Sequence, residues 1–421
     1  RLSNEEITVK KFFLSFLTCI LLLCSFPTQM ILADELDLPA KSAIAVEADT
    51  GKILYEKDSE KKRDVGGLST LLTTYLIFEA IHDKKLSLKD SVKLSEEALA
   101  LNDIEGAGTI PMESNQYTVD QLLTALLVGN SSTAALALAE KIGGSEKGFV
   151  EKMKQKLSTW GIRSPHLINA TGLNTQTLSG NPEGKADENQ LSAYDIAVIA
   201  KHLLQDFPEV TQYTSKPTAL FSQTQIENPN LMLEGMPNYR SGVDGLRVSN
   251  STKGGITFAA STTQNGIHMI TVVLGVEAVD GDPYARFVTT SSLMNYVVRT
   301  FYSSIVVKKG DPYGNSKVSI MDGKAQSVSA VAKKDFYVVE KQGNQTEAKI
   351  RFKSNQSQFK APVKSGTDVG LLQYSDPEKI GRGYLEDQEP TVEMVAEKNV
   401  EKSFFLKVWW NKFVRYVNEK L

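Results

Sequence analysis

The chain has little cysteine and little histidine, which narrows the chemistry that it can perform. Among its 421 residues are 2 cysteines, Cys19 and Cys24, and both lie in one apolar run near the N-terminus. The remainder therefore has no disulfide framework, no thiolate nucleophile and no cysteine-based metal site. Its 4 histidines are scattered, without a pair at metal-ligand spacing. We expect no bound metal, and a zinc hydrolase is disfavoured.

An excess of basic residues is also absent. The chain has 47 Lys and Arg against 50 Asp and Glu, for a formal net charge of -3. Nucleic-acid-binding domains usually have a clear basic excess, so we expect no nucleic-acid partner. The length is sufficient for two or three domains with a sizeable core.

The apolar run covers residues 12–32, after two lysines and before an acidic pair. A basic start, an apolar centre and a small residue at the end are typical of a secretory signal peptide, here residues 1–33. An uncleaved transmembrane anchor is the alternative, because a span needs about 20 apolar residues. Pro27 and Gln29 near the end of the run favour cleavage, so we expect an exported protein.

Residues 38–304 have the pattern of one α+β domain. Two short β-prone runs flank an Asp-Thr-Gly turn at residues 49–51 and predict a hairpin. Helical patterns follow, one of them with Thr118 as its N-cap. Strand patterns return over residues 245–277, and a helix over residues 283–302 ends the unit. This order predicts an antiparallel sheet with packed helices.

Residues 306–395 have short alternating runs that are separated by Asp-Gly, Gly-Asn and Ser-Gly turns. This pattern predicts a small all-β domain. No site can be recognised in it, and we expect it to be a spacer between the first domain and the membrane.

The last segment, residues 401–421, predicts an amphipathic helix. Its basic residues fall mainly on one half of a helical wheel and its apolar residues on the other. The predicted membrane-contacting residues are Phe405, Leu406, Trp409, Trp410, Phe413 and Val417. A basic, aromatic-rich helix that is too charged to span favours binding to an anionic membrane surface. The alternative is a terminal helix that docks on the protein.

These segments resemble the low-molecular-mass penicillin-binding proteins, the D-alanyl-D-alanine carboxypeptidases of bacterial peptidoglycan, and most closely those of Gram-positive cocci. The resemblance covers essentially the whole chain and is carried by residues 45–55, 134–140, 169–174, 234–239, 243–246 and 404–410. It implies the penicillin-binding, β-lactamase-like transpeptidase fold. It also implies a serine that is acylated by the penultimate D-Ala of a stem pentapeptide, without metal or cofactor.

The first catalytic motif of this family does not match. It is Ser-x-x-Lys at the start of a helix, where the serine is the nucleophile and the lysine is its base. The aligned positions here are Gly67 and Thr70. Ser69 lies in the same turn, but it has Leu72 and Thr73 where a lysine is required. This turn therefore lacks a nucleophile paired with a base.

The other two motifs also differ. Ser-x-Asn, which relays protons and holds the substrate amide, aligns with a segment that begins at Asn130 and ends at Ser132. Lys-Thr-Gly, on the strand beside the cleft, aligns with Arg247, Val248 and Ser249. Arg247 keeps the positive charge and is our candidate for binding a substrate carboxylate. Val248 lacks the hydroxyl, and Ser249 places a side chain where glycine allows close backbone approach.

The main hypothesis is therefore a non-catalytic homologue that acts in cell-wall metabolism as a binding or scaffolding module on the outer face of the cytoplasmic membrane. Peptidoglycan stem peptides and the membrane surface are its expected partners, and the sequence identifies no protein partner. One alternative is an active serine-type carboxypeptidase with a rearranged site. Two other Ser-x-x-Lys patterns, at Ser59 and Ser357, lack the companion motifs. The other alternative is a muropeptide sensor that uses Arg247.

Overall fold

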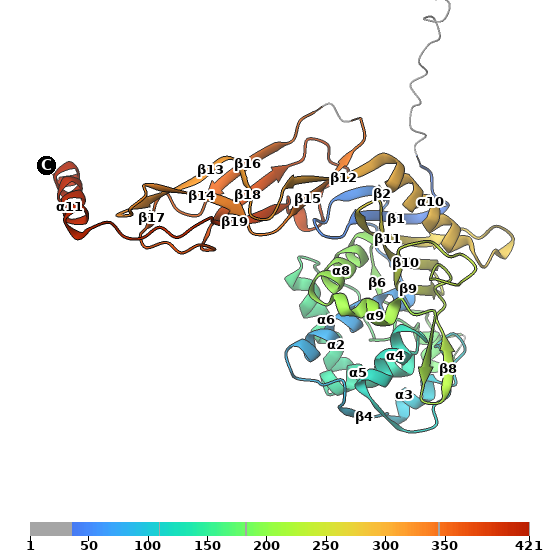
Figure 1. Ribbon diagram of the computed structural model, residues 1–421. Helices are drawn as coiled ribbons and strands as arrows, with labels where there is room; N and C mark the ends of the chain where they lie inside the picture. Colours follow the sequence, from blue (N-terminus) through green and yellow to red (C-terminus); the bar gives the residue numbers. More distant parts are fainter. Residues whose placement is uncertain (1–35, 109, 182, 344–345, 421) are drawn as a thin grey trace, which may run out of the picture. The chain divides into compact units, whose positions relative to one another are not determined.

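The computed structural model describes residues 36–420, except residues 109, 182 and 344–345 (Figure 1). The predicted signal peptide, residues 1–33, and its apolar run lie outside the described residues. Within the described part of the chain, none of the helices has the length and apolarity that crossing a membrane requires. The residues from Leu38 to Leu421 form a single unit.

A five-stranded antiparallel sheet lies at the centre of the first domain, in the order β2-β1-β11-β10-β9. Its strands are β1 (Ala40–Glu47), β2 (Ile53–Lys57), β9 (Val243–Ser251), β10 (Gly255–Gln264) and β11 (Ile267–Val276). The β1–β2 pair confirms the hairpin that was predicted around the Asp-Thr-Gly turn. The strand β9 is at one edge of the sheet, which leaves its outer side available to form the wall of a site.

Helices cover both faces of this sheet, α10 (Ala285–Thr300) on one and α8 (Ala193–Asp206) on the other (Figure 1). Because both faces are covered, all but one of the residues of β11 are buried. The helix predicted over residues 283–302 ends two residues early, at Thr300, where β12 (Phe301–Val307) begins. The run Phe-Tyr-Ser-Ser-Ile-Val-Val is rich in aromatic and β-branched residues, which favour a strand.

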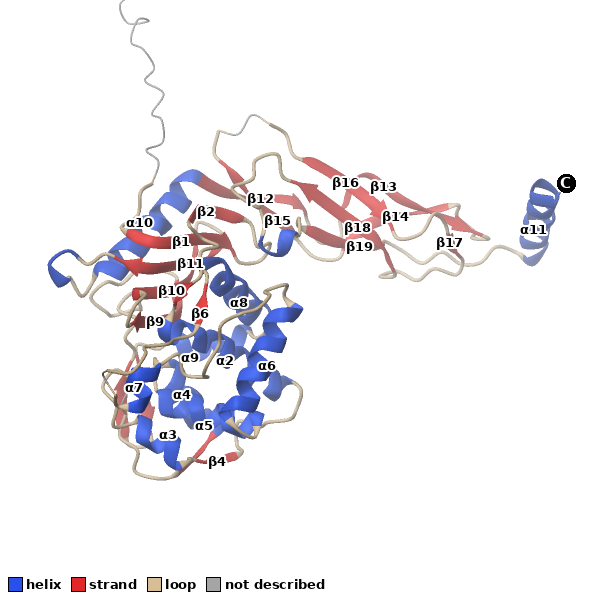
Figure 2. Cartoon of the chain, turned by 180° about the vertical axis from the view of Figure 1, so that it is seen from behind, coloured by secondary structure: helices blue, strands red, loops and turns tan. Residues whose placement is uncertain are grey.

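The remaining helices of the first domain form a block beneath the sheet (Figure 2). They are η1 (Gly66–Ser69), α2 (Thr70–His82), α3 (Glu96–Leu101), α4 (Val119–Leu127), α5 (Ser132–Gly143), α6 (Glu146–Thr159), α7 (Thr175–Ser179), η2 (Pro208–Val210) and α9 (Thr211–Thr214), with η3 (Val279–Gly281) before α10. Short strand pairs connect them: β3 (Arg63–Asp64) with β6 (Gln190–Leu191), β4 (Ser91–Lys93) with β5 (Gln116–Thr118), and β7 (Thr218–Phe221) with β8 (Thr224–Glu227).

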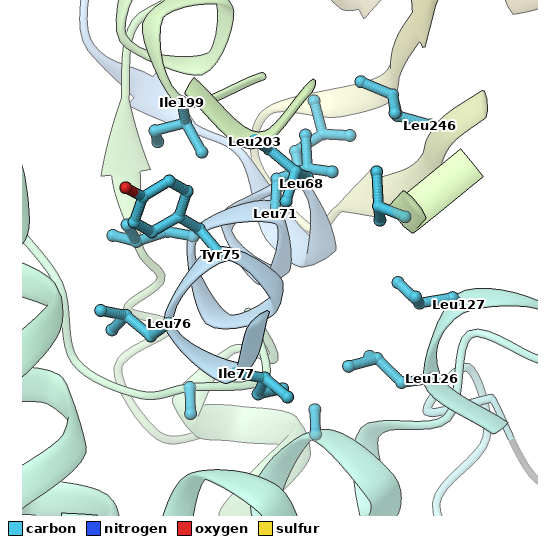
Figure 3. Close-up of a cluster of buried hydrophobic side chains, with 14 of the residues drawn as sticks. Leu68, Leu71, Tyr75, Leu76, Ile77, Leu126, Leu127, Ile199, Leu203 and Leu246 are labelled. Carbon is cyan, nitrogen blue, oxygen red and sulfur yellow. The ribbon is translucent and has the colours of Figure 1, made fainter. Parts of the chain in front are cut away.

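The helix α2 lies in the middle of this block. Its residues from Thr70 to Phe78 are all buried, so it is covered on every side, as expected for a helix that is hydrophobic all round. Figure 3 shows Leu71 and Leu76 of α2 among side chains from α8, α4 and β9. This packing fixes the start of α2, next to Gly67, which we expect to align with the first motif of the resembled family.

The second domain is all-β, as predicted. Its elements are β12, β13 (Pro312–Met321), β14 (Ser327–Ala332), β15 (Phe336–Lys341), β16 (Lys349–Ser354), β17 (Phe359–Lys360), β18 (Asp368–Ser375), η4 (Leu385–Asp387) and β19 (Thr391–Ala396). They form a six-stranded sheet, β16-β18-β19-β14-β13-β17, and a β12–β15 pair around a separate hydrophobic core.

The C-terminal helix is α11 (Phe405–Lys420), which lies within the segment predicted to be amphipathic. Its Trp409 and Trp410 side chains are 62% and 58% exposed. The residues just before it belong to the β domain, because Ser403 N donates to Asp322 O at 2.8 Å. The helix therefore begins after this connection rather than at residue 401.

Candidate active-site cleft

A cleft of about 630 Å³ lies beside the edge strand β9. Its wall includes the start of the η1–α2 segment, the loop between α4 and α5, residues 171–174 and the N-terminal part of α10. Of the predicted motif residues, those that line it are Gly67, Asn130, Ser132, Arg247, Val248 and Ser249. The fold thus brings together three segments that are far apart in the sequence. Thr70 does not line the cleft.

Gly67 and Ser249 are in direct contact across the cleft. The backbone N–H of Gly67 donates a hydrogen bond to Ser249 Oγ at 2.7 Å. A Cβ atom added at Gly67 would lie 2.9 Å from that oxygen and 3.5 Å from Ser249 Cβ. Real Cβ atoms essentially never approach another heavy atom as closely as 2.9 Å. A side chain at position 67 would therefore require the Ser249 hydroxyl to move.

The turn before Gly67 packs against the backbone of β9. Gly66 has φ +54°, and a Cβ atom there would lie 2.5 Å from Asn250 O. Only glycine combines this backbone conformation with such a close approach. The turn thereby holds the Gly67 N–H in line with Ser249.

The hydroxyls of Ser69 and Thr70 are used inside the protein. Ser69 is fully buried; its Oγ donates to Gly66 O at 2.9 Å and accepts from Asn189 Nδ2 at 2.8 Å. Thr70 Oγ1 donates to Gly67 O at 2.6 Å. Both hydroxyls thus stabilise the η1 turn, and neither residue is part of the cleft wall. This turn presents no hydroxyl to a ligand.

The two additional Ser-x-x-Lys patterns lie elsewhere. Ser59 Oγ donates to Glu56 Oε2 at 3.0 Å, and the lysine of its pattern, Lys62, pairs with Asp195. Ser357 is exposed in the β domain. Neither serine lines the cleft.

The loop between α4 and α5 is tied to β9. Asn130 has φ +56°, and its Nδ2 donates to Val248 O at 3.0 Å. The next residue, Ser131, is the N-cap of α5 and accepts from Ala134 N at 3.3 Å. Ser132 follows on the cleft wall. The bond from Asn130 to Val248 thus places the residues that align with the second and third motifs next to each other.

Arg247 is a buried cation without a counterion among the residues that the structure describes. Its side chain is 5% exposed, and Nη1 donates to Leu126 O at 2.7 Å. Its Nε has no partner, and no carboxylate in the described part of the chain pairs with this residue. Burial lowers the pKa of Arg247 to about 10, so the group stays charged at neutral pH. A buried charge of this kind is costly unless a ligand or another group compensates it.

Three further charged residues of the cleft were missed by the sequence analysis: Arg286, Glu188 and the exposed Glu105. Arg286 donates from Nη1 to Ser249 O at 2.7 Å and from Nη2 to Asn250 Oδ1 at 2.6 Å, so it holds the end of β9. Glu188 is 2% exposed and lies just before β6. None of these residues belongs to a family motif or to a pattern that predicts a site. Among the described residues, no group of three or more His, Cys, Asp or Glu is suited to hold a metal ion.

Comparison with known proteins shows the family of this chain. Residues 29–278 match the family model for D-alanyl-D-alanine carboxypeptidase, which is more than half of the chain. Residues 301–402 match the model for the C-terminal domain of penicillin-binding protein 5. The chain belongs to the D-alanyl-D-alanine carboxypeptidase family. This confirms the predicted family and fold class, a domain of helices and an antiparallel sheet followed by an all-β domain.

Relatives in the family match most of the chain. The D-alanyl-D-alanine carboxypeptidase DacF of Bacillus subtilis is 27% identical over 347 residues, which is 80% of this chain and 82% of that protein. A crystal structure of penicillin-binding protein 3 from Streptococcus pneumoniae, described as a peptidoglycan synthesis regulatory factor, has 44% identity and a TM-score of 0.83, covering 87% of this chain and 100% of that one. Penicillin-binding protein 5 of Haemophilus influenzae, with 23% identity and a TM-score of 0.64 over 87% of this chain and 99% of that one, supports the fold alone.

Proposed function

We propose that this chain is a non-catalytic member of its family, which binds peptidoglycan peptides in the cleft and acts in cell-wall metabolism as a binding or scaffolding module. The observation that carries the proposal is the hydrogen bond from Gly67 N to Ser249 Oγ, at 2.7 Å. Acyl transfer needs backbone donors that are free to stabilise the developing oxyanion. Here the Ser249 hydroxyl already accepts a hydrogen bond from the Gly67 N–H, and Gly67 is the position that we align with the family's nucleophile.

The changes at the aligned motifs act on separate parts of the reaction. Gly67 supplies no nucleophilic atom, and Thr70 supplies no base at neutral pH. Loss of a nucleophile and base that act as a unit lowers turnover by about 10⁶. In addition, Ser249 Oγ accepts the hydrogen bond of the Gly67 N–H, so this donor is not free to stabilise an oxyanion. The site therefore lacks this transition-state stabilisation as well as the nucleophile.

Labelling with a fluorescent penicillin tests whether the chain can still form an acyl-enzyme. The purified full-length chain, labelled beside an active family member, should form no covalent adduct that survives denaturation. A stoichiometric adduct would contradict the proposal, and the labelled peptide would identify the nucleophile. If Ser69 were that nucleophile, the active carboxypeptidase alternative would hold, and Ser69→Ala would abolish both the adduct and turnover.

Peptide binding is the second part of the proposal, with Arg247 as the partner of the ligand carboxylate. Calorimetric titration with an acetylated peptide that ends in D-Ala-D-Ala should show binding that Arg247→Ala weakens roughly 10- to 100-fold, because charge-assisted hydrogen bonds contribute about 1.5–3 kcal/mol. Arg299→Ala, at an exposed position of α10 outside the cleft, is the matched control. Equal affinity of the Arg247 variant and the parent chain would remove Arg247 from this role.

We further propose that α11 attaches the exported chain to the outer face of the cytoplasmic membrane. The exposure of Leu406, Trp409 and Trp410 supports this, because exposed apolar and aromatic side chains on a basic helix suit a bilayer interface. The proposed organisation is a signal peptide at residues 1–33, the carboxypeptidase-like domain at 38–304, the β domain at 306–395 as spacer, and the anchoring helix within 401–421.

A further inference from the structure

Glu188 has an unusual position in the wall of the cleft. Its side chain is 2% exposed, and Oε1 accepts a hydrogen bond from Thr252 N at 2.8 Å. The other oxygen, Oε2, is buried without a hydrogen-bond partner in the part of the chain that the structure describes. Buried carboxylate oxygens are normally paired, so this oxygen indicates a missing donor.

The backbone around Glu188 is held rigidly. The adjacent residue, Asn189, accepts from Ile168 N at 2.7 Å through Oδ1. Its Nδ2 donates to Ser69 Oγ at 2.8 Å and to Asn169 O at 2.9 Å. These bonds hold the segment against the start of α2, and the bond from Thr252 N holds the carboxylate through Oε1. Its position is therefore preorganised for a ligand.

Glu188 and Arg247 line the same cleft, but they do not pair with each other. Each is at least nine-tenths buried, and each has a polar atom without a partner among the described residues. Two buried opposite charges in separate parts of one cleft are complementary to a ligand with a negative group and a positive group. The volume of about 630 Å³ is in the range of sites for small ligands, so a short peptide is a suitable occupant.

We propose that Glu188 forms a cation-binding subsite that accepts a primary ammonium group, such as that of a lysine side chain, from a peptide whose carboxylate pairs with Arg247. The ammonium group has three donors, so it can bind Oε2 while Oε1 keeps its bond to Thr252. This inference rests on the proposed function, since it requires that the cleft binds peptides.

Two peptides that differ by one charge test the subsite directly. The full-length chain in detergent micelles is titrated by calorimetry with N-acetyl-Lys-D-Ala-D-Ala and with N-acetyl-norleucyl-D-Ala-D-Ala. Norleucine has nearly the same apolar length but no ammonium group. We expect the lysine peptide to bind at least about tenfold more tightly, the ratio for one charge-assisted hydrogen bond. Equal affinities would overturn the subsite even if no variant were made.

Variants then assign the preference to Glu188. Glu188→Gln keeps the shape of the side chain and should reduce the affinity ratio to about one, while the norleucine peptide still binds and shows that the cleft is folded. Glu105→Gln is the matched control, because Glu105 is an exposed carboxylate on the same cleft wall, and this variant should keep the ratio. A ratio that survives in Glu188→Gln would overturn the assignment.

The two proposals fail in different ways in this experiment. Binding of both peptides with equal affinity, weakened by Arg247→Ala, would overturn the Glu188 subsite and leave the proposed function standing. Absence of binding by both peptides would overturn peptide binding itself, and the subsite with it.

Discussion

At the scale of single residues, the main feature of this chain is the coupling of Gly67 to Ser249. Each residue alone would be an ordinary difference from the motifs that we expect at these positions. Together they form one hydrogen bond, from Gly67 N to Ser249 Oγ. The hydroxyl of Ser249 also lies where a side chain at position 67 would be placed. We therefore expect that a serine introduced at position 67 alone would displace the Ser249 hydroxyl.

This coupling predicts a non-additive effect on stability. Gly67→Ser should lower the free energy of unfolding by about 1–3 kcal/mol, because Ser249 must move and the Gly67 N–H loses its acceptor. In a Ser249→Gly background the same substitution should cost much less. Urea unfolding of the four proteins in the double-mutant cycle measures the coupling. Equal costs in both backgrounds would show that the two residues are independent.

At the scale of elements, local sequence signals act as expected. Thr118 was predicted to cap a helix, and α4 indeed begins with a capping box. Thr118 Oγ1 accepts from Gln121 N at 3.2 Å, and Gln121 Oε1 accepts from Thr118 N at 2.9 Å. This cap fixes the start of α4, whose C-terminal end supplies Leu126 O to Arg247.

Removal of this cap should therefore destabilise the first domain. We expect Thr118→Ala to lower the free energy of unfolding by about 1 kcal/mol, because the N–H of Gln121 loses its acceptor at the helix start. Ser158→Ala, at an exposed position of α6, is a suitable control and should change stability by less than about 0.5 kcal/mol. Denaturant unfolding that is followed by circular dichroism compares the two.

The C-terminal helix gives a second prediction at this scale. A chain that ends after Ser403 keeps the contacts of residues 400–403 with the β domain, such as the pairing of Val400 with Val363, and loses only α11. It should no longer sediment with anionic liposomes, because the exposed aromatic side chains of α11 and the positive charge of its sequence are absent. Trp409→Ala combined with Trp410→Ala should weaken sedimentation while leaving the helix in place. Unchanged sedimentation of the truncated chain would exclude α11 as the anchor.

At the scale of the whole molecule, the two folded domains are linked by a buried ion pair. Lys52 Nζ lies 2.6 Å from Asp376 Oδ2, with side chains 4% and 2% exposed, and it also donates to Val339 O at 2.7 Å. Nearby, Leu385 of the β domain is part of the first domain's hydrophobic core. The β domain is thus joined to the first domain by specific contacts as well as by the chain.

Breaking this ion pair from one side should be costly. Lys52→Met leaves Asp376 buried without its cation and should lower the free energy of unfolding by about 3–5 kcal/mol. The double variant Lys52→Met with Asp376→Leu should recover much of the loss, because no uncompensated charge remains. Lys154→Met, which removes an exposed ion pair with Glu151, should have a much smaller effect. Thermal unfolding of the full-length chain measures these differences, and a similar shift for Lys52→Met and Lys154→Met would contradict the role of the buried pair.

Features that depend on neighbouring residues could be predicted from the sequence alone: the β1–β2 hairpin, the cap at Thr118, the strands of the β domain and the family. Alternation, turn residues and capping side chains act over a few positions, so they can be read without the fold. The predicted end of α10 and the predicted start of α11 were less accurate. Strand pairing of β12 decides where α10 ends, and contacts of residues 400–403 with the β domain decide where α11 begins.

The lining of the cleft and the contacts of each side chain in it could be seen only in the folded chain. The bond between Gly67 and Ser249 joins residues that are 182 positions apart. Glu188 and Arg286 belong to no motif, and the packing of β9, α10 and the segment before β6 brings them to the cleft. Ser69 lies in the right turn by sequence, yet burial and its bond to Asn189 turn its hydroxyl to the interior. Such contacts depend on the relative placement of distant segments, which the collapse of one shared core establishes.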